Sequence, residues 1–427
     1  MAKFCVILVG LFILAHPLLS QSLSKTELKI SETVRQQYPE TGQLLEKVVN
    51  INSGTLNLAG VRMVGKLMGE ELAKIGFNVE WVTLPDSLNR AGHLVATRQG
   101  NRGKKLFLIG HLDTVFEKSL PFEPFTRVND TTATGQGVND MKGGDVLIIA
   151  ALKALHANKL LDGTSITVYF TGDEESSGGP ESRRDFIERA RQCDVALAFE
   201  TAQGLNTVTT GRRGSSSWNL QVVSRTGHSS RVFSDLGYGA IFEAARILNE
   251  FRRTLSQEPY LTFNPGLIVG GSDVRYDGQA AKAETTGKTN IVAPSALVKG
   301  DLRFLSEAQK ESARARMREI VEKPLPLTKS TITFADGIPS MEPSAANEGL
   351  RQQVDQLSRD MGLGPVAAGD PGARGAGDVS FVAQYLPCLD GLGASGKGAH
   401  SIEESINLKE YPLLIQRTAL LLYRLTR

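Results

Sequence analysis

Two histidine motifs carry side chains that could do chemistry. His111 lies two residues before Asp113, directly after the apolar run 105–109. In an extended backbone residues two apart face the same way, so this carboxylate can orient the imidazole and raise its basicity as a metal ligand. His400 lies near the C-terminus, within the segment 398–404. Alone, a histidine two residues before an aspartate is more often a hydrogen-bonded surface pair than a metal site.

Acidic residues occur at three further positions that call for a partner. Asp140 stands among glycines in the segment 135–144, where it could simply cap a helix. Three consecutive acids at 173–175 end another apolar run, and considered alone they fit a solvated acidic turn. Glu200 ends the apolar run 195–199, and a buried strand should not end in an unpartnered carboxylate.

Together these groups indicate a pair of metal ions. Several follow predicted strands, and open α/β sheets place their sites at the carboxyl ends of their strands. Two histidines and three carboxylates suit two zinc-like ions. Each ion would take one histidine, one terminal carboxylate and one shared carboxylate, which leaves room for a water between the ions.

The elements that must position these groups alternate between helix and strand. Such alternation predicts a parallel or mixed sheet covered on both faces. Helices are expected over 27–49, 58–75, 146–155, 181–191, 350–361 and 413–425, and strands over 78–83, 93–98, 105–109, 165–171 and 195–199.

From residue 214 the order changes to β-α-β-β-α-β, which is typical of a ferredoxin-like module. Its strands are expected over 218–224, 261–269, 295–304 and 330–334, and its helices over 239–253 and 307–322. The predicted fold class is α/β, a mixed-sheet domain (22–213 and 338–427) interrupted by an inserted α+β domain (214–337).

Composition and the N-terminus bear on partners and location. The 427 residues include 48 Lys+Arg and 46 Asp+Glu, and this net charge of +2 excludes the strong basic field of nucleic-acid-binding proteins.

Residues 1–21 resemble a secretory signal, because their apolar core at 4–15 is short for a membrane span. An uncleaved anchor is the alternative. We expect an exported protein, periplasmic or secreted, with no membrane partner once the signal is removed. Cys193 and Cys388 could then pair or stay free.

The chain resembles the M20 family of dinuclear zinc metallopeptidases, and within it the glutamate carboxypeptidase branch. Five motifs in the family's order carry the resemblance: His-Leu-Asp at 111–113, Gly-Val-Asn-Asp-Met-Lys-Gly-Gly at 137–144, Asp-Glu-Glu at 173–175, Glu200, and Gly-Ala-His-Ser at 398–401. The similarity extends from about residue 40 to the C-terminus. It implies a zinc-peptidase catalytic domain with an inserted lid that usually forms a homodimer.

The resemblance implies two zinc ions per chain and assigns their ligands. Asp140 would bridge the two ions. Glu175 and His400 would complete one site, and His111 and Glu200 the other.

Further roles follow from the same resemblance. Asp113 would orient the ligands, and Glu174 resembles the general base that takes a proton from water and passes it to the leaving amine. The family also implies a cis peptide bond after Asp140. In the lid, His228 would reach the partner subunit's site and stabilise the oxyanion, whereas Asn290 and Arg303 would bind the free carboxylate of the substrate. The alternatives without a role in catalysis or binding are a loop histidine for His228 and an inter-strand salt bridge for Arg303.

The implied activity is hydrolysis of the amide bond to a C-terminal amino acid in short peptides or N-acyl amino acids. A deacylase or dipeptidase of the same family is an alternative, as is an inactive binding paralogue, although the filled ligand positions and Glu174 argue against inactivity. One departure concerns specificity. Glutamate-preferring members carry a basic residue after the ligand that matches Glu200, whereas residues 201–211 contain neither Lys nor Arg.

Overall fold

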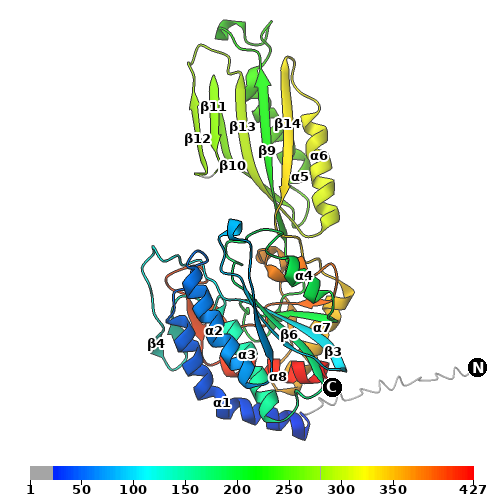
Figure 1. Ribbon diagram of the computed structural model, residues 1–427. Coiled ribbons are helices and arrows are strands. Elements are labelled where there is room, and N and C mark those ends of the chain that lie inside the picture. Colours follow the sequence, from blue (N-terminus) through cyan, green and yellow to red (C-terminus); the bar gives the residue numbers. More distant parts are fainter. Residues whose placement is uncertain (1–22, 279) are drawn as a thin grey trace, which may run out of the picture.

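The computed structural model describes residues 23–278 and 280–427, so the signal predicted over 1–21 lies outside the described residues. Figure 1 shows two bodies, which meet at the lower ends of β9 (Gly214–Ser224) and β14 (Thr328–Asp336). We call residues 214–336 the inserted domain and the rest the main domain. No helix in the described ranges is both long and apolar enough to cross a membrane.

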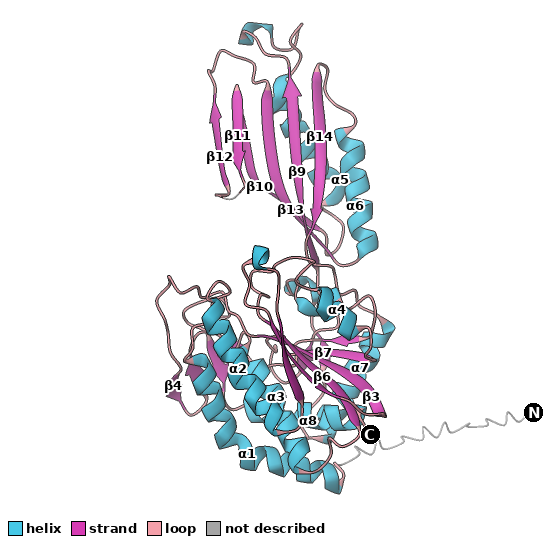
Figure 2. Cartoon of the chain, in the orientation of Figure 1, coloured by secondary structure: helices cyan, strands magenta, loops and turns pink. Residues whose placement is uncertain are grey.

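A mixed six-stranded sheet forms the centre of the main domain (Figure 2). In spatial order its strands are β1 (Asn78–Val82), β2 (His93–Arg98), β6 (Thr164–Thr171), β3 (Arg102–His111), β7 (Val195–Ala198) and β16 (Cys388–Leu389). β3 runs parallel to β6 and β7, and β7 parallel to β16, whereas β1 and β2 form antiparallel pairs. The α/β class with a mixed sheet, predicted from the sequence, is confirmed.

Both faces of this sheet are buried, because successive strand residues point to opposite sides. Along β3, Leu106 and Leu108 join one core, and Phe107 and Ile109 join another on the opposite face. The main-domain helices pack onto these faces: α1 (Lys25–Val49), α2 (Leu58–Lys74), α3 (Lys142–Ala157), α7 (Ala345–Asp360) and α8 (Tyr411–Leu425) contribute to the first core, and α4 (Arg184–Ala190) to the second.

A smaller sheet, which the sequence analysis did not predict, brings the C-terminal segment to the glycine-rich turn before α3. Its order is β17 (Gly396–Lys397), β18 (Ser405–Asn407), β5 (Thr132–Thr134) and β4 (Thr126–Asn129). These strands are too short and polar to give an alternating pattern. Because β18 pairs with β5, the loop that carries His400 lies beside the turn that carries Asp140. A parallel pair of two-residue strands, β8 (Thr207–Val208) and β15 (Ala367–Ala368), also escaped prediction.

The inserted domain has the βαββαβ order expected from its sequence. Its antiparallel sheet is ordered β10 (Thr262–Gly271), β13 (Ser295–Phe304), β9 and β14, and α5 (Gly239–Leu255) and α6 (Glu307–Val321) lie on one face (Figure 2). Buried Trp218 packs edge-on against Phe251 of α5, with ring centroids 5.9 Å apart. The hairpin of β11 (Asp273–Asp277) and β12 (Lys282–Thr286) was not predicted.

Two helix boundaries differ from those predicted, and the pairing of the two cysteines, which the sequence left open, is resolved. Helix α4 is shorter than the predicted 181–191, because residues before Arg184 form turns. Helix α3 starts at Lys142, four residues before its predicted start at 146, so the helix begins within the motif of Asp140. Cys193 and Cys388 are both free thiols.

Two glycine substitutions test the packing of this fold. A Cβ on Gly300 would lie 2.1 Å from Cε2 of Trp218, so Gly300→Ala should destabilise the inserted domain by about 1–3 kcal/mol. Gly349 in α7 is the matched control, because its Cβ would meet nothing within 4 Å. Gly349→Ala should be neutral or stabilising by up to about 1 kcal/mol, since Ala favours helix. Thermal and urea unfolding give the free energy of unfolding of both variants. A Gly300→Ala variant as stable as the wild type would contradict the described packing of Trp218.

Candidate dinuclear metal centre

The five predicted ligands meet at one edge of the central sheet. His111 ends β3, and Glu175 and Glu200 follow β6 and β7. Because these three strands are parallel neighbours, their carboxyl ends reach the same edge. Asp140 arrives in the turn before α3, and His400 in the loop between β17 and β18.

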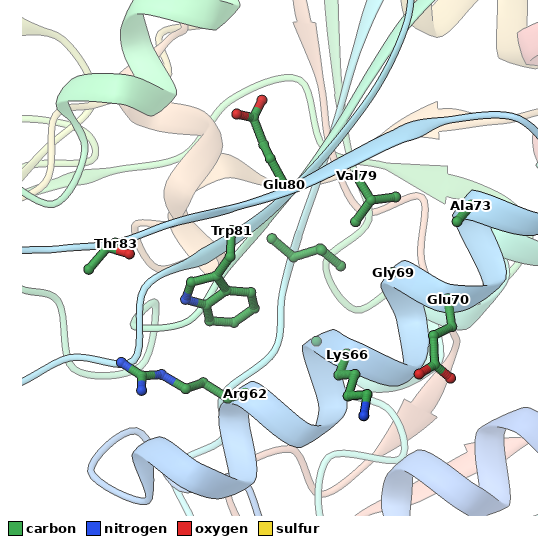
Figure 3. A pocket seen from close by; sticks show the side chains of 11 residues that line it. Arg62, Lys66, Gly69, Glu70, Ala73, Val79, Glu80, Trp81 and Thr83 are labelled. Atoms are coloured by element: carbon green, nitrogen blue, oxygen red, sulfur yellow. The ribbon is translucent and has the colours of Figure 1, made fainter.

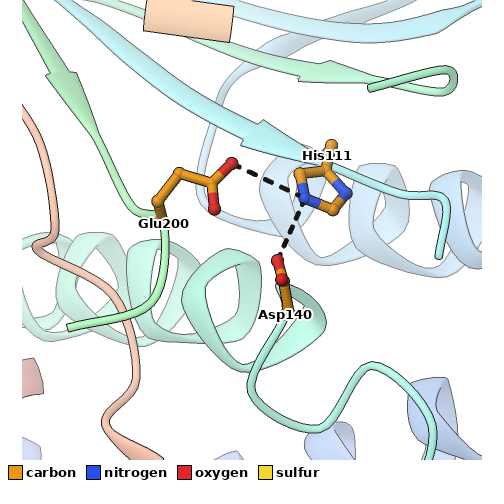
Figure 4. A group of neighbouring side chains, drawn as sticks. All are labelled: His111, Asp140 and Glu200. Carbon is orange, nitrogen blue, oxygen red and sulfur yellow. Dashed lines mark ion pairs between the residues drawn. The ribbon is translucent and has the colours of Figure 1, made fainter. Parts of the chain in front are cut away.

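Asp140 joins two ligand groups. Its Oδ1 lies 3.3 Å from Nε2 of His111, which is 3.6 Å from Oε1 of Glu200 (Figure 4). Its Oδ2 lies 3.2 Å from Nε2 of His400, which is 3.2 Å from Oε2 of Glu175. The peptide bond from Asp140 to Met141 is cis, as the family resemblance implies.

The donor set fits two divalent ions. In each group the ligand atoms all lie within 4.8 Å of one another. Ligands at about 2.0–2.1 Å from a tetrahedral ion are about 3.3 Å apart, close to the contacts observed here. Oε1 of Glu175 is buried without a hydrogen-bond partner, and such an atom is suited to a cation.

The pKa values of both histidines and of Glu200 are raised, whereas the pKa of Asp140 is lowered, because its hydrogen bonds to His111 and His400 outweigh its burial. Hydrogen bonds to Asp140 and Glu175 raise the pKa of His400 to about 10. Burial opposes protonation of His111, but Asp113, Asp140 and nearby carboxylates outweigh it and raise its pKa well above the usual range. Burial and the Asp140 charge raise the pKa of Glu200 to about 7. Metal ions would displace the protons that this cluster otherwise holds.

Asp113 holds the loop of the acidic motif. Its carboxylate accepts hydrogen bonds from Thr55 Oγ1 at 2.7 Å and from the N–H groups of Glu174 and Glu175 at 3.0 and 3.1 Å. Nδ1 of His111 lies 3.0 Å from the main-chain carbonyl of Asp113 and 3.5 Å from its carboxylate. Asp113 thus orients His111 at the end of β3 and holds the backbone of Glu174 and Glu175 after β6. Thr55 is a partner of Asp113 that the sequence did not reveal.

Glu174 lies beside the ligand groups without belonging to either. Burial, with the charge of Glu200 next in importance, raises its pKa well above the usual range. His111 acts in the opposite direction, so both side chains are within electrostatic reach of Glu174. Cations at the cluster would also favour its ionised form.

Glu404 is a positioning residue for which sequence reasoning assigned no role. Its buried carboxylate accepts hydrogen bonds from the N–H groups of Gly137, Asn139 and Asp140 at 2.9, 2.8 and 2.8 Å. The turn that presents the bridging carboxylate is therefore fixed by the same C-terminal segment that supplies His400. The only available signal was the position of Glu404 four residues after that histidine.

A buried ion-pair network supports the acidic loop from behind. Arg183 contacts Asp173 at 2.5 Å and Asp378 at 2.7 Å, and all three side chains are buried. Asp378 also accepts a hydrogen bond from Thr171 at 2.6 Å. Asp173, the first of the three consecutive acids, thus serves as an ion-pair partner, and the loop around Asp378 gains a structural function.

The three predicted residues of the inserted domain do not come together within one chain. Arg303 lies beside Ser215 at the start of β9, near the main domain, and its Nε donates to Asp301 at 2.8 Å. His228 and Asn290 lie at the opposite end, where Ser229 N–H donates to the Asn290 carbonyl. β13 alone separates these ends by eight residues, about 26 Å. Within one chain Asn290 and Arg303 are therefore too far apart to bind the same carboxylate, and their shared role stays a prediction that needs a second subunit.

An apolar groove lies away from these ligand groups. It has a volume of about 760 Å³ and lies between α2 and β1, with Gly65, Gly69 and Trp81 among its lining residues (Figure 3). It contains none of the predicted site residues. The ligand geometry, rather than cavity size, identifies the candidate centre.

Known proteins are similar to this chain in sequence or in fold. The family model described as Peptidase family M20/M25/M40 matches residues 107–424. Carboxypeptidase G2 of Pseudomonas sp. (strain RS-16) is 27% identical over 404 residues, which cover 93% of this chain and 92% of that protein. Aminopeptidase PepT from Bacillus cereus has a similar fold, with a TM-score of 0.71 at 16% identity over 93% of this chain and 99% of that chain. The YXEP protein of Bacillus subtilis, described as a dinuclear metal binding peptidase, has a TM-score of 0.66 at 10% identity over 92% and 99%.

The family match covers well over half of the chain, and it includes His111 and the loop that carries His400. The two ligand groups agree with a family that includes dinuclear metal-binding peptidases. The chain therefore belongs to peptidase family M20/M25/M40 and is a metallopeptidase.

Proposed function

We propose that this protein is an exported dinuclear carboxypeptidase that hydrolyses the amide bond to a C-terminal amino acid in short peptides or N-acyl amino acids. The observation that carries the proposal is Glu174 beside two ligand groups that share Asp140. The similarity to Carboxypeptidase G2 supports the direction of attack, from the carboxyl end of the substrate. Export rests on the signal-like sequence of residues 1–21.

Zinc is the metal proposed for both positions. His111, Asp140 and Glu200 would hold one ion, and Asp140, Glu175 and His400 the other. Each group offers one imidazole and two carboxylates, a three-ligand set that leaves a coordination position open, as catalytic zinc sites do. Bound ions of this kind polarise a substrate carbonyl and lower the pKa of water.

Glu174 would move the proton. Its carboxylate accepts a proton from the attacking water and then donates it to the amide nitrogen as the C–N bond breaks. The hydrogen bond from its N–H to Asp113 fixes the backbone that carries this carboxylate.

Arg303 would bind the free carboxylate of the substrate. It lies on the part of the inserted domain closest to the main domain, and 38% of its side chain is exposed. Its ion pair with Asp301 is equally exposed, with 44% of that side chain accessible, and exposed pairs are weak. A substrate carboxylate can therefore share or replace Asp301 at little cost.

A homodimer through the inserted domain would supply the remaining residues. Phe233, Ile241 and Phe242 are 61, 51 and 52% exposed, and Phe233 packs against Phe242 with ring centroids 5.4 Å apart. Burial of such a patch in a second copy of the chain is favourable. Phe233 follows His228 by five residues, so an interface here would place His228 and Asn290 close to the other subunit.

Replacement of the proposed base tests the mechanism. Glu174→Gln should lower kcat by about 100-fold or more, because it removes general base catalysis and keeps the side-chain shape. Metal content, measured by mass spectrometry of the elements, should be unchanged. Glu181→Gln, at an exposed position outside the site, is the matched control and should keep full activity. Wild-type turnover by Glu174→Gln would refute the proton-transfer role.

Mixing two inactive variants tests the dimer. His228→Ala and Glu174→Gln should each have low activity, but exchanged subunits form mixed dimers in which one of two sites is complete. Equal mixing should recover roughly a quarter of wild-type turnover, since half of the dimers are mixed. Native mass spectrometry verifies the exchange. Mixed dimers without recovered activity would show that His228 does not act across the interface.

A further inference from the structure

A second arginine is held next to the candidate metal centre. Arg374 directly follows the short helix η3 (Pro371–Ala373). Its guanidinium donates to Thr201, through Nη1 to Oγ1 at 3.3 Å and through Nη2 to the main-chain carbonyl at 3.1 Å. Because Thr201 directly follows the ligand Glu200, these bonds place a fixed positive charge one residue from the metal site. The charges of Glu200 and Asp140 are within electrostatic reach of Arg374.

Arg374 has no acidic partner among the described residues within ion-pair distance. Its Nε is buried without a hydrogen-bond acceptor. Burial, followed by the neighbouring Arg212, lowers the pKa of Arg374, so its surroundings disfavour the charge. A guanidinium in such a place is normally paired, because an unpaired buried charge is costly.

Arg212 differs from Arg374, because its guanidinium already lies close to two carboxylates. Its Nε lies 2.5 Å from Asp390, and its Nη2 lies 3.9 Å from Glu200. Its Nη1 donates to the carbonyls of Gly375 and Ala376 at 3.3 and 3.0 Å. Arg212 therefore fixes the loop that presents Arg374, whereas the Arg374 guanidinium has no carboxylate within ion-pair distance in the described part of the chain.

We propose that Arg374 is a specificity-determining residue that binds an anionic side chain on the C-terminal residue of the substrate. The inference rests on the carboxypeptidase function proposed above. Residues 201–211 contain no Lys or Arg, so the positive charge at Thr201 comes from Arg374, in a loop more than 160 residues later in the sequence. The expected substrates are those that end in a dicarboxylic amino acid, with Arg303 on the main-chain carboxylate and Arg374 on the side-chain carboxylate.

Paired substrates that differ by one charge test this assignment. The metal-loaded enzyme should have a higher kcat/KM for N-acyl-glutamate than for N-acyl-glutamine. Arg374→Gln should lower kcat/KM for the glutamate substrate by about 10- to 100-fold, the usual effect of one charge-assisted hydrogen-bonded contact. It should leave the glutamine substrate unchanged, and Arg374→Lys should keep part of the preference. Arg127→Gln removes an exposed charge that takes part in none of these contacts and serves as the control.

A binding measurement separates this inference from the proposed function. Calorimetry should show tighter binding of glutarate than of its monoamide to wild type, and a loss of the difference in Arg374→Gln. If no substrate is cleaved but this difference holds, the carboxypeptidase proposal fails and the anion site stands. An unchanged glutamate-to-glutamine ratio in Arg374→Gln would overturn the specificity role. So would an equal loss with both substrates, because that is the effect of a merely structural residue.

Discussion

Three carboxylates and two imidazoles occupy a small and mostly buried volume in this protein, and the carboxylates repel one another unless positive charge lies between them. Asp140 is the centre of this constraint, because one of its oxygens faces His111 and the other faces His400. Glu404 accepts hydrogen bonds from three N–H groups and so fixes the turn of Asp140. The carboxylate of Asp140 therefore cannot move away to relieve the repulsion. Bound cations satisfy the whole set at once.

The sheet explains why such a cluster can persist. Parallel strands β3, β6 and β7 bring their carboxyl ends to one edge, so residues far apart in sequence arrive at the same place. The loop after β6 is held from two sides, by Asp113 through its N–H groups and by Arg183 through Asp173. Charged groups that do no chemistry thus keep Glu174 and Glu175 in position.

The sequence predicted the sheet class, most helices and strands, and the five clustered candidate ligands, because three of the five follow apolar runs and the family resemblance assigned all five. It could not predict contacts that join distant segments through single hydrogen bonds, as Glu404 and Thr55 do. The small strands beside His400 have no pattern of their own, since pairing rather than composition creates them. The strand predicted over 295–304 already separates Asn290 from Arg303, but the sequence could not show which end of that strand lies near the main domain.

Metal stoichiometry tests the central role of Asp140 most directly. Purified protein reconstituted with zinc and freed of excess should contain two ions per chain by elemental mass spectrometry. Asp140→Asn should weaken both sites together, because both ligand groups use this carboxylate, whereas Glu200→Gln should weaken only one. A wild-type content of one ion per chain, or an Asp140→Asn variant that keeps two tightly bound ions, would contradict a centre built around one shared carboxylate.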